Sequence, residues 1–194
     1  MNHRIADLPI EKGWRRKLAE IRYKEIYRQS LAIILFLFYA LIATPPTALI
    51  SAVAGAFVVV GALIRFWAAG VVMKNEQLAT SGPYAYVRHP LYVGNILGVG
   101  GMTVISGTWW AYLITAMFFW LFYPTTIKYE DGKLENLFGQ PWRDWSSQVR
   151  ALIPRITPYS REPMGWSIRR AAGRNGEAAI LIYVLVCIGI ALSR

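Results

Sequence analysis

The 194-residue sequence has few of the residues that crosslink a chain or hold a metal. Its one cysteine, Cys187, excludes an internal disulfide framework and a cysteine-based zinc site. Its two histidines, His3 and His89, exclude most histidine-rich metal sites, so we expect no metal. Charged residues make up only 16% of the chain, below the roughly 25% of an average soluble domain. Hydrophobic residues make up 55%, which argues against an ordinary soluble globule and against a disordered chain.

The apolar residues are gathered into five long runs, a pattern typical of a multi-pass membrane protein. The runs cover residues 30–44, 47–72, 91–106, 109–127 and 178–192. Pro45-Pro46 separates the first two runs, and Gly107-Thr108 separates the third from the fourth, so that each pair forms a helical hairpin. We therefore expect an all-α membrane protein with about five transmembrane helices.

The net charge of +10 is better explained by membrane topology than by nucleic-acid binding. The sequence carries no basic groove, zinc finger or RNA-binding signature. Of the 21 basic residues, 19 lie in the segments 1–28, 73–90 and 128–176, which fall on one side of a five-helix topology. The positive-inside rule places these segments in the cytoplasm and the C-terminus outside. The compact size and short loops suit a bacterial inner membrane.

The charge pattern also suggests how the chain is divided. Residues 1–29 form a basic amphipathic segment, which we expect to be a helix lying on anionic lipid; a solvated basic helix is the alternative. Residues 30–154 form the expected membrane core, and its motifs cover 78–94 and 126–154. Residues 155–176 are expected to be a basic surface linker, and 177–194 a C-terminal transmembrane helix.

The segment 78–94 carries the first group of candidate functional residues. Gly82-Pro83 predicts a turn, and Arg88-His89-Pro90 directly precedes the third run, with Pro90 in the first helical turn. The start of a helix offers free N–H groups to an anion, and the fork of Arg88 matches a carboxylate bidentately. The alternative is that Arg88 meets lipid phosphates and His89 only caps a turn.

The segment 126–154 carries the second group. Glu130-Asp131 directly follows the fourth apolar run, where acidic residues are often merely solvated. Two apolar stripes come next, formed by Leu134, Leu137 and Phe138 and then by Trp142, Trp145 and Val149. The first stripe predicts a packed helical face that ends at Gly139, and the second predicts packing in the core or at the membrane.

Together these two segments resemble the isoprenylcysteine carboxyl methyltransferase family, one of a wider group of integral membrane methyltransferases that includes the phospholipid methyltransferases. The matching elements, over about residues 78–154, are Gly82-Pro83-Tyr84, Arg88-His89-Pro90-Leu91-Tyr92, Glu130-Asp131, Leu134, Phe138-Gly139, Trp142, Trp145 and Ile153-Pro154. Their order, their spacing and the hairpin between them all agree, so the match is more specific than a single short motif.

The resemblance implies a methyltransferase that uses S-adenosylmethionine in a pocket on the cytoplasmic side. By this match the candidate cofactor contacts are Tyr84, His89, Pro90, Tyr92, Glu130 and Asp131, and the candidate catalytic residues are Arg88 and Glu130. The glycines at 98, 100 and 101 are no cofactor loop because they lie inside an apolar helix, where with Gly94 they predict close helix packing.

The acceptor is expected to be a lipophilic or small molecule, or a lipid headgroup, that enters between the helices. A carboxylate acceptor needs only a cation, whereas an amine or thiol needs a base, for which Glu130 or His89 are candidates. The family's carboxyl methyltransferases usually carry an arginine where this chain has Thr126, which disfavours a prenylcysteine carboxylate. An NADPH-dependent reductase of the related sterol reductase group and a non-enzymatic membrane scaffold are the alternatives. The oligomeric state is left open.

Overall fold

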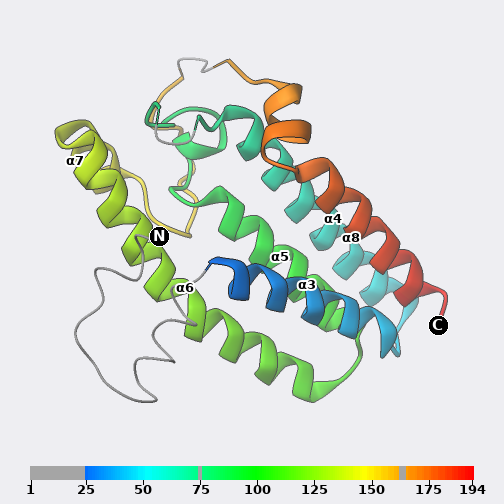
Figure 1. Cartoon of the computed structure of the whole chain (residues 1–194). Helices are drawn as coiled ribbons and strands as arrows, with labels where there is room; N and C mark the ends of the chain where they lie inside the picture. The colour runs from blue at the N-terminus through cyan, green and yellow to red at the C-terminus, as the bar shows by residue number, and fades with distance from the viewer. Residues whose placement is uncertain (1–24, 74–75, 162–164) are drawn as a thin grey trace.

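The computed structural model describes residues 25–73, 76–161 and 165–194. Its elements in order are α3 (Glu25–Leu41), α4 (Ala48–Val71), η1 (Gly82–Ala85), α5 (Pro90–Ile105), α6 (Trp109–Phe138), α7 (Gln140–Gln148), η2 (Arg169–Arg174) and α8 (Glu177–Leu192) (Figure 1). The described part of the chain contains no strand, so the all-α prediction is confirmed there. The amphipathic helix predicted over 1–29 lies outside the described residues, apart from its last five, which begin α3.

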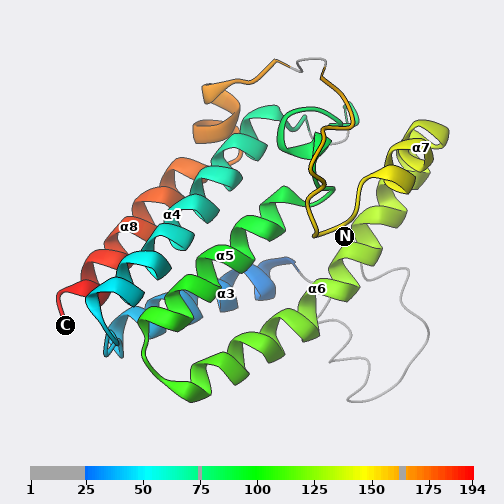
Figure 2. The same cartoon turned by 180° about the vertical axis from the view of Figure 1, so that it is seen from behind.

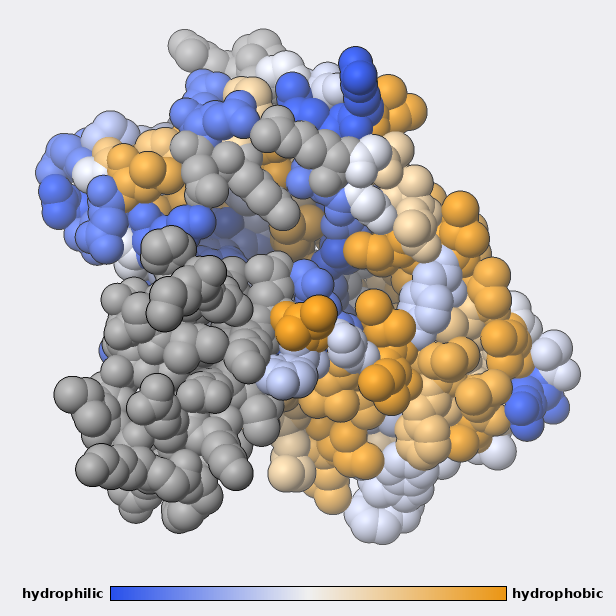
Figure 3. Space-filling model, in the orientation of Figure 1, coloured by the Kyte–Doolittle hydropathy of each residue, from blue (hydrophilic) through white to orange (hydrophobic). Residues whose placement is uncertain are grey.

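Five apolar helices form where the five hydrophobic runs predict them. Two of them, α4 and α6, are long and apolar enough to cross a membrane, whereas α3, α5 and α8 have 17, 16 and 16 residues. The number of spans therefore stays a prediction. Large apolar side chains are exposed along α3, α4 and α8, and they gather over one part of the surface (Figure 3). An apolar surface of this kind fits a lipid environment better than water.

The connections between the apolar helices sort to two ends of the bundle (Figures 1 and 2). The turns at 42–47 and 106–108 lie at one end with the C-terminus. The chain on either side of η1, the segment after α7, and η2 lie at the other end. Both sequence motifs and most of the described basic residues outside the helices are therefore at one end, as the predicted topology requires.

Glycines allow α4 and α5 to pack backbone against backbone. A Cβ placed on Gly61 would lie 2.5 Å from the carbonyl oxygen of Gly94, and one on Gly101 would lie 2.6 Å from that of Ala54. No side chain fits at such distances, so these positions need glycine. The predicted close packing is confirmed for Gly94 and Gly101, while a Cβ on Gly100 would meet open space.

Helix α6 continues well beyond its apolar run. The sequence predicts a membrane helix over 109–127, directly followed by the acidic pair and then by a packed helical face that ends at Gly139. The structure confirms the end at Gly139, where φ is 59°, and corrects the rest to one unbroken helix with the acidic pair inside it. The residues after 127 include lysine, glutamate and leucine, which favour helix as strongly as the apolar run does. The change in composition therefore marks where the helix becomes polar and not where it stops.

Part of the segment expected as a surface linker is helical. Within 155–176, η2 packs against the C-terminal end of α4. The Ser167 N–H and Arg170 Nε donate to the Gly70 carbonyl at 3.0 and 3.1 Å, and Asn175 Nδ2 donates to the Ala69 carbonyl at 2.8 Å. The last carbonyls of a helix lack partners within the helix, so this segment serves as the cap of α4.

Candidate functional site

The two motifs meet at the polar end of the bundle. The N–H groups of Arg88 and His89 donate to the carbonyls of Arg150 and Ala151 at 2.9 and 3.1 Å. These bonds hold the residues just before α5 against the chain that follows α7. As a result, the first motif lies beside the acidic part of α6, although 42 residues separate His89 from Asp131.

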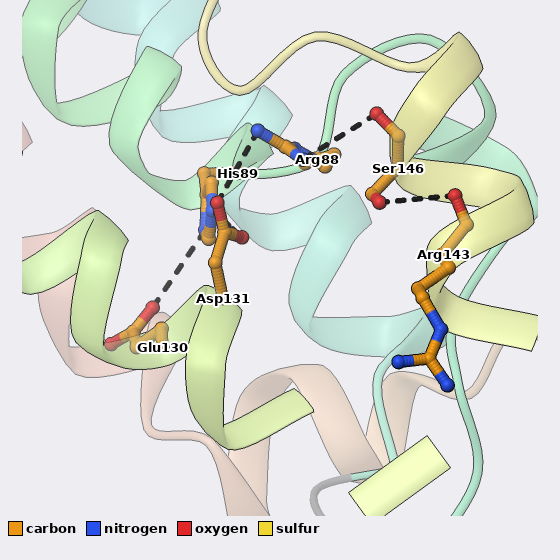
Figure 4. Close-up of polar contacts among 6 residues, drawn as sticks. All are labelled: Arg88, His89, Glu130, Asp131, Arg143 and Ser146. Atoms are coloured by element: carbon orange, nitrogen blue, oxygen red, sulfur yellow. Dashed lines mark hydrogen bonds and ion pairs between the residues drawn. The ribbon is translucent and has the colours of Figure 1, made fainter. Parts of the chain in front are cut away.

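Four side chains of the two motifs contact one another directly (Figure 4). His89 Nε2 lies 3.0 Å from Asp131 Oδ1, and His89 Nδ1 lies 3.7 Å from Glu130 Oε2. Arg88 Nη2 lies 3.2 Å from Asp131 Oδ2. The imidazole thus has a carboxylate at each of its two nitrogens, and Asp131 also contacts the guanidinium. We call Arg88, His89, Glu130 and Asp131 the motif cluster.

Tyr92 joins the motif cluster from the first turn of α5. Its hydroxyl donates to Glu130 Oε1 at 2.6 Å, and its ring stacks on His89 with centroids 5.3 Å apart and planes at 15°. Pro90 is the first residue of α5, as predicted, and the side chain of His89 makes no capping hydrogen bond. The alternative in which His89 only caps a turn is therefore wrong, because its ring faces the acidic pair.

Arg88 extends from Asp131 toward α7. Its Nη1 lies 3.5 Å from the Ser146 carbonyl, and its guanidinium carbon lies 5.9 Å from the centre of the Trp142 ring. Two buried donors, Arg88 Nε and Trp142 Nε1, have no hydrogen-bond partner among the described residues. Buried donors are normally satisfied, so each of these two nitrogens is suited to an acceptor oxygen.

Tyr84 lies in a second, smaller core instead of in the motif cluster. It is buried with Trp142, Trp145 and Val149, and its carbonyl accepts a hydrogen bond from Trp145 Nε1 at 3.2 Å. Burial raises the pKa of the Tyr84 hydroxyl above its ordinary value, and the negative charge of Glu130 raises it further. Tyr84 is thus a neutral phenol at physiological pH, and the structure shows no hydrogen bond from it to the acidic pair.

The apolar stripes predicted after the acidic pair account for this second core. The stripe of Trp142, Trp145 and Val149 is buried, which confirms the prediction that it packs in the interior. Leu134 and Phe138 pack against the same core, whereas Leu137 is 46% exposed and does not belong to it.

Arg28 is a neighbour of the motif cluster that the sequence analysis missed. It was placed with the basic residues that lie on lipid, but it is only 7% exposed, and its guanidinium carbon lies 5.2 Å from the centre of the Tyr92 ring. The feature of the sequence that indicates its burial is its position in the helical repeat. Arg28 comes seven and eleven residues before Leu35 and Tyr39, which are both buried, so it shares their face of α3.

A further polar cluster lies deeper in the bundle. Arg65 donates from Nε and Nη2 to the two carboxylate oxygens of Glu177 at 3.0 and 2.6 Å, and from Nη1 to Asn95 Oδ1 at 2.6 Å. These residues come from α4, α8 and α5. The only signal in the sequence was a charged residue inside an apolar run, which needs a partner wherever it is buried.

Comparison with known families matches the region that carries the first motif and the beginning of the second. The model of the isoprenylcysteine carboxyl methyltransferase family matches residues 42–136. This match covers 95 of the chain's 194 residues. The predicted resemblance is therefore confirmed, and the matched region contains all four members of the motif cluster. Arg28 and Glu177 lie outside it.

Curated relatives agree with this assignment. The cobalt-zinc-cadmium resistance protein CzcN of Cupriavidus metallidurans is 35% identical over 106 residues, which cover 54% of this chain and 48% of the relative. The nickel-cobalt-cadmium resistance protein NccN of Alcaligenes xylosoxydans is 34% identical over 100 residues, covering 50% and 46%. The protein-S-isoprenylcysteine O-methyltransferase of Schizosaccharomyces pombe is 34% identical over 83 residues, covering 43% and 35%. The chain thus spans about half or less of each relative's length, and no solved structure matches it.

Proposed function

We propose that the protein is an integral membrane methyltransferase that uses S-adenosylmethionine and acts on a lipophilic or small acceptor. The observation that carries the proposal is the contact between Arg88-His89 and Glu130-Asp131 inside the family region. Relatives of this family are named O-methyltransferases, which supports an enzyme of this class and does not favour the reductase alternative. In keeping with the charge distribution, we place the motif cluster on the cytoplasmic side of a multi-pass protein of a bacterial inner membrane.

The residues of the motif cluster fit the chemistry of this cofactor. S-adenosylmethionine carries a carboxylate and two cationic groups, an ammonium and a sulfonium. Arg88 Nε and Trp142 Nε1 are unsatisfied donors that suit the carboxylate, and Glu130 and Asp131 supply negative charge for the cationic groups. When bound, the cofactor would supply an electrophilic methyl group.

The side chains in and around the cluster would orient the two reactants, exclude water and, for some acceptors, accept a proton. Methyl transfer is an in-line displacement, so the protein has to orient the two reactants and exclude water. Asp131 fixes the Arg88 guanidinium and the His89 ring, and the Tyr92 ring stacks on the imidazole of His89. Glu130 is the more exposed of the two acids, at 28%, so it is the carboxylate that we assign to accept a proton from an amine or thiol acceptor. A carboxylate acceptor would need no such base.

The names of two bacterial relatives refer to metal resistance, which raises the question of a metal-binding role. Within the part of the chain that the structure describes, no group of three or more His, Cys, Asp or Glu side chains could hold a metal ion. The motif cluster instead pairs its acids with a histidine and an arginine. We assign the side chains of the motif cluster to methyl transfer.

The proposal is tested by transfer of tritium from methyl-labelled S-adenosylmethionine in membranes that contain the protein. The products would be separated into lipid-extractable, protein-bound and volatile fractions. We expect one fraction to be labelled by the wild type and by Glu135→Ala, a control on the same helix whose side chain is 39% exposed. Glu130→Ala should lose about a hundredfold or more of this activity. Equal labelling by Glu130→Ala would remove that assignment, and NADPH-dependent reduction without any labelling would contradict the methyltransferase.

A further inference from the structure

The motif cluster has a cation on each of two sides. On the side of α7, Arg88 contacts Asp131 and the face of Trp142. On the side of α3, Arg28 lies over the ring of Tyr92, whose hydroxyl is bonded to Glu130. S-adenosylmethionine has a single carboxylate, and the unsatisfied donors that suit it lie on the side of α7. The Arg28 side therefore has a positive charge that the cofactor does not need.

Arg28 is buried without a carboxylate partner. It is 7% exposed, yet among the side chains that the structure describes it forms no ion pair with an acid, and its guanidinium lies against the aromatic face of Tyr92. Burying an arginine in this way is unfavourable unless an anion completes its environment. The other buried arginine, Arg65, shows the usual solution, since both oxygens of Glu177 contact its guanidinium. Because contact with a ring face does not use the guanidinium N–H groups, the donors of Arg28 remain suited to an anionic oxygen.

We infer that Arg28 binds an anionic oxygen group, a carboxylate or a phosphate, on a lipophilic methyl acceptor. This inference rests on the proposed function. The lipophilic part is taken from the proposed function. Arg28 itself lies in the first turn of α3, on the buried face that also carries Leu35 and Tyr39. An anionic group that contacts Arg28 would lie beside Tyr92, whose hydroxyl is bonded to Glu130.

The inference is tested by binding of three probes to purified protein in detergent with S-adenosylhomocysteine present. The probes are N-acetyl-S-farnesylcysteine, which has a carboxylate, its neutral carboxamide, and lysophosphatidic acid, which has a phosphate. The variants are Arg28→Ala, Arg28→Lys and, as a control, Arg143→Ala, whose arginine is 54% exposed. We expect at least one anionic probe to bind the wild type more tightly than the carboxamide does.

Arg28→Ala should weaken binding of that anionic probe by about tenfold to a hundredfold and leave binding of the carboxamide unchanged. Arg28→Lys should keep most of the affinity, and all variants should bind S-adenosylhomocysteine as the wild type does, which also shows that they are folded. The anionic probe that responds tells a carboxylate site from a phosphate site.

Three results would overturn the inference. The first is that the wild type binds the carboxamide as tightly as both anions. The second is that Arg28→Ala binds the anions as tightly as the wild type does. The third is that Arg28→Ala loses affinity for S-adenosylhomocysteine, which would assign Arg28 to the cofactor. A wild type that fails to bind S-adenosylhomocysteine but binds an anion through Arg28 would support the anion site and remove the methyltransferase.

Discussion

Two buried polar clusters in this protein are built from the same kinds of residue but are completed to different degrees. In the inner cluster, Arg65 satisfies both oxygens of Glu177 and also contacts Asn95, and the two charged side chains are 16% and 6% exposed. In the motif cluster, Glu130 is 28% exposed and Arg88 keeps an unsatisfied buried Nε. The first arrangement is closed, whereas the second has capacity for a ligand.

The difference teaches that buried charge alone does not identify a functional site. The inner cluster joins α4, α5 and α8, and each of the three Arg65 side-chain nitrogens has a partner, so its role is to hold the helices together. The motif cluster joins α5 and α6 through a histidine between two acids and leaves donors on the side of α7. Variants in the two clusters should therefore separate loss of stability from loss of binding.

The largest expected effect is on stability, in the inner cluster. Glu177→Ala would leave the Arg65 guanidinium buried with only Asn95 as partner, which should lower the free energy of unfolding by about 3 to 5 kcal/mol. The double variant Arg65→Met with Glu177→Leu removes both charges and should recover most of this loss. Unfolding followed in detergent measures both. A single variant as stable as the wild type would show that the pair does not hold α8.

The next effect is on ligand affinity, in the motif cluster. Arg88→Ala should weaken S-adenosylhomocysteine binding by about a hundredfold, because a charge-assisted hydrogen bond is lost. Stability should change by only about 1 kcal/mol, since Asp131 keeps its contact with His89. Arg88→Lys should not restore binding, because an ammonium lacks the planar fork. Titration calorimetry gives the affinities, and full rescue by lysine would contradict the assigned role.

A smaller effect is expected at the glycine contact between α4 and α5. In Gly94→Ala the new Cβ would lie 2.5 Å from the Gly61 carbonyl oxygen and 2.6 Å from Arg65 Cγ. This overpacking should destabilise the protein by about 2 kcal/mol. Gly100→Ala is the matched control, because nothing lies near its Cβ position. Equal melting temperatures of the two variants in detergent would show that the helices do not depend on this close approach.

The smallest effect is expected at an exposed ion pair beyond both clusters. Glu135 and Arg143 are 39% and 54% exposed, and their atoms lie 3.1 Å apart. Glu135→Gln should change the free energy of unfolding by less than about 1 kcal/mol, because solvent screens such pairs. It should leave S-adenosylhomocysteine affinity unchanged. A marked loss of stability would contradict the weak ion pair, and a marked loss of S-adenosylhomocysteine affinity would extend the site to α7.

Much of the helical layout was predictable because the apolar runs are long and are separated by proline and glycine turns. The unbroken course of α6 through the acidic pair was not predictable, since the residues after 127 favour helix while being polar. The partners of the motif cluster were anticipated from motif order, but their contacts depend on backbone bonds between Arg88-His89 and residues 150–151. Arg28 and the Arg65–Glu177 pair escaped prediction because the sequence alone does not show which helix faces meet.

The most direct test of the account is equilibrium binding of labelled S-adenosylmethionine to the purified protein and to Asp131→Asn. Asp131 contacts both Arg88 and His89, so the neutral amide should disturb both arms of the motif cluster at almost constant size. The account predicts saturable binding by the wild type and by Glu135→Gln, and binding at least about tenfold weaker by Asp131→Asn. Binding by Asp131→Asn that equals the wild type, or no saturable binding by the wild type, would contradict a cofactor site at this cluster.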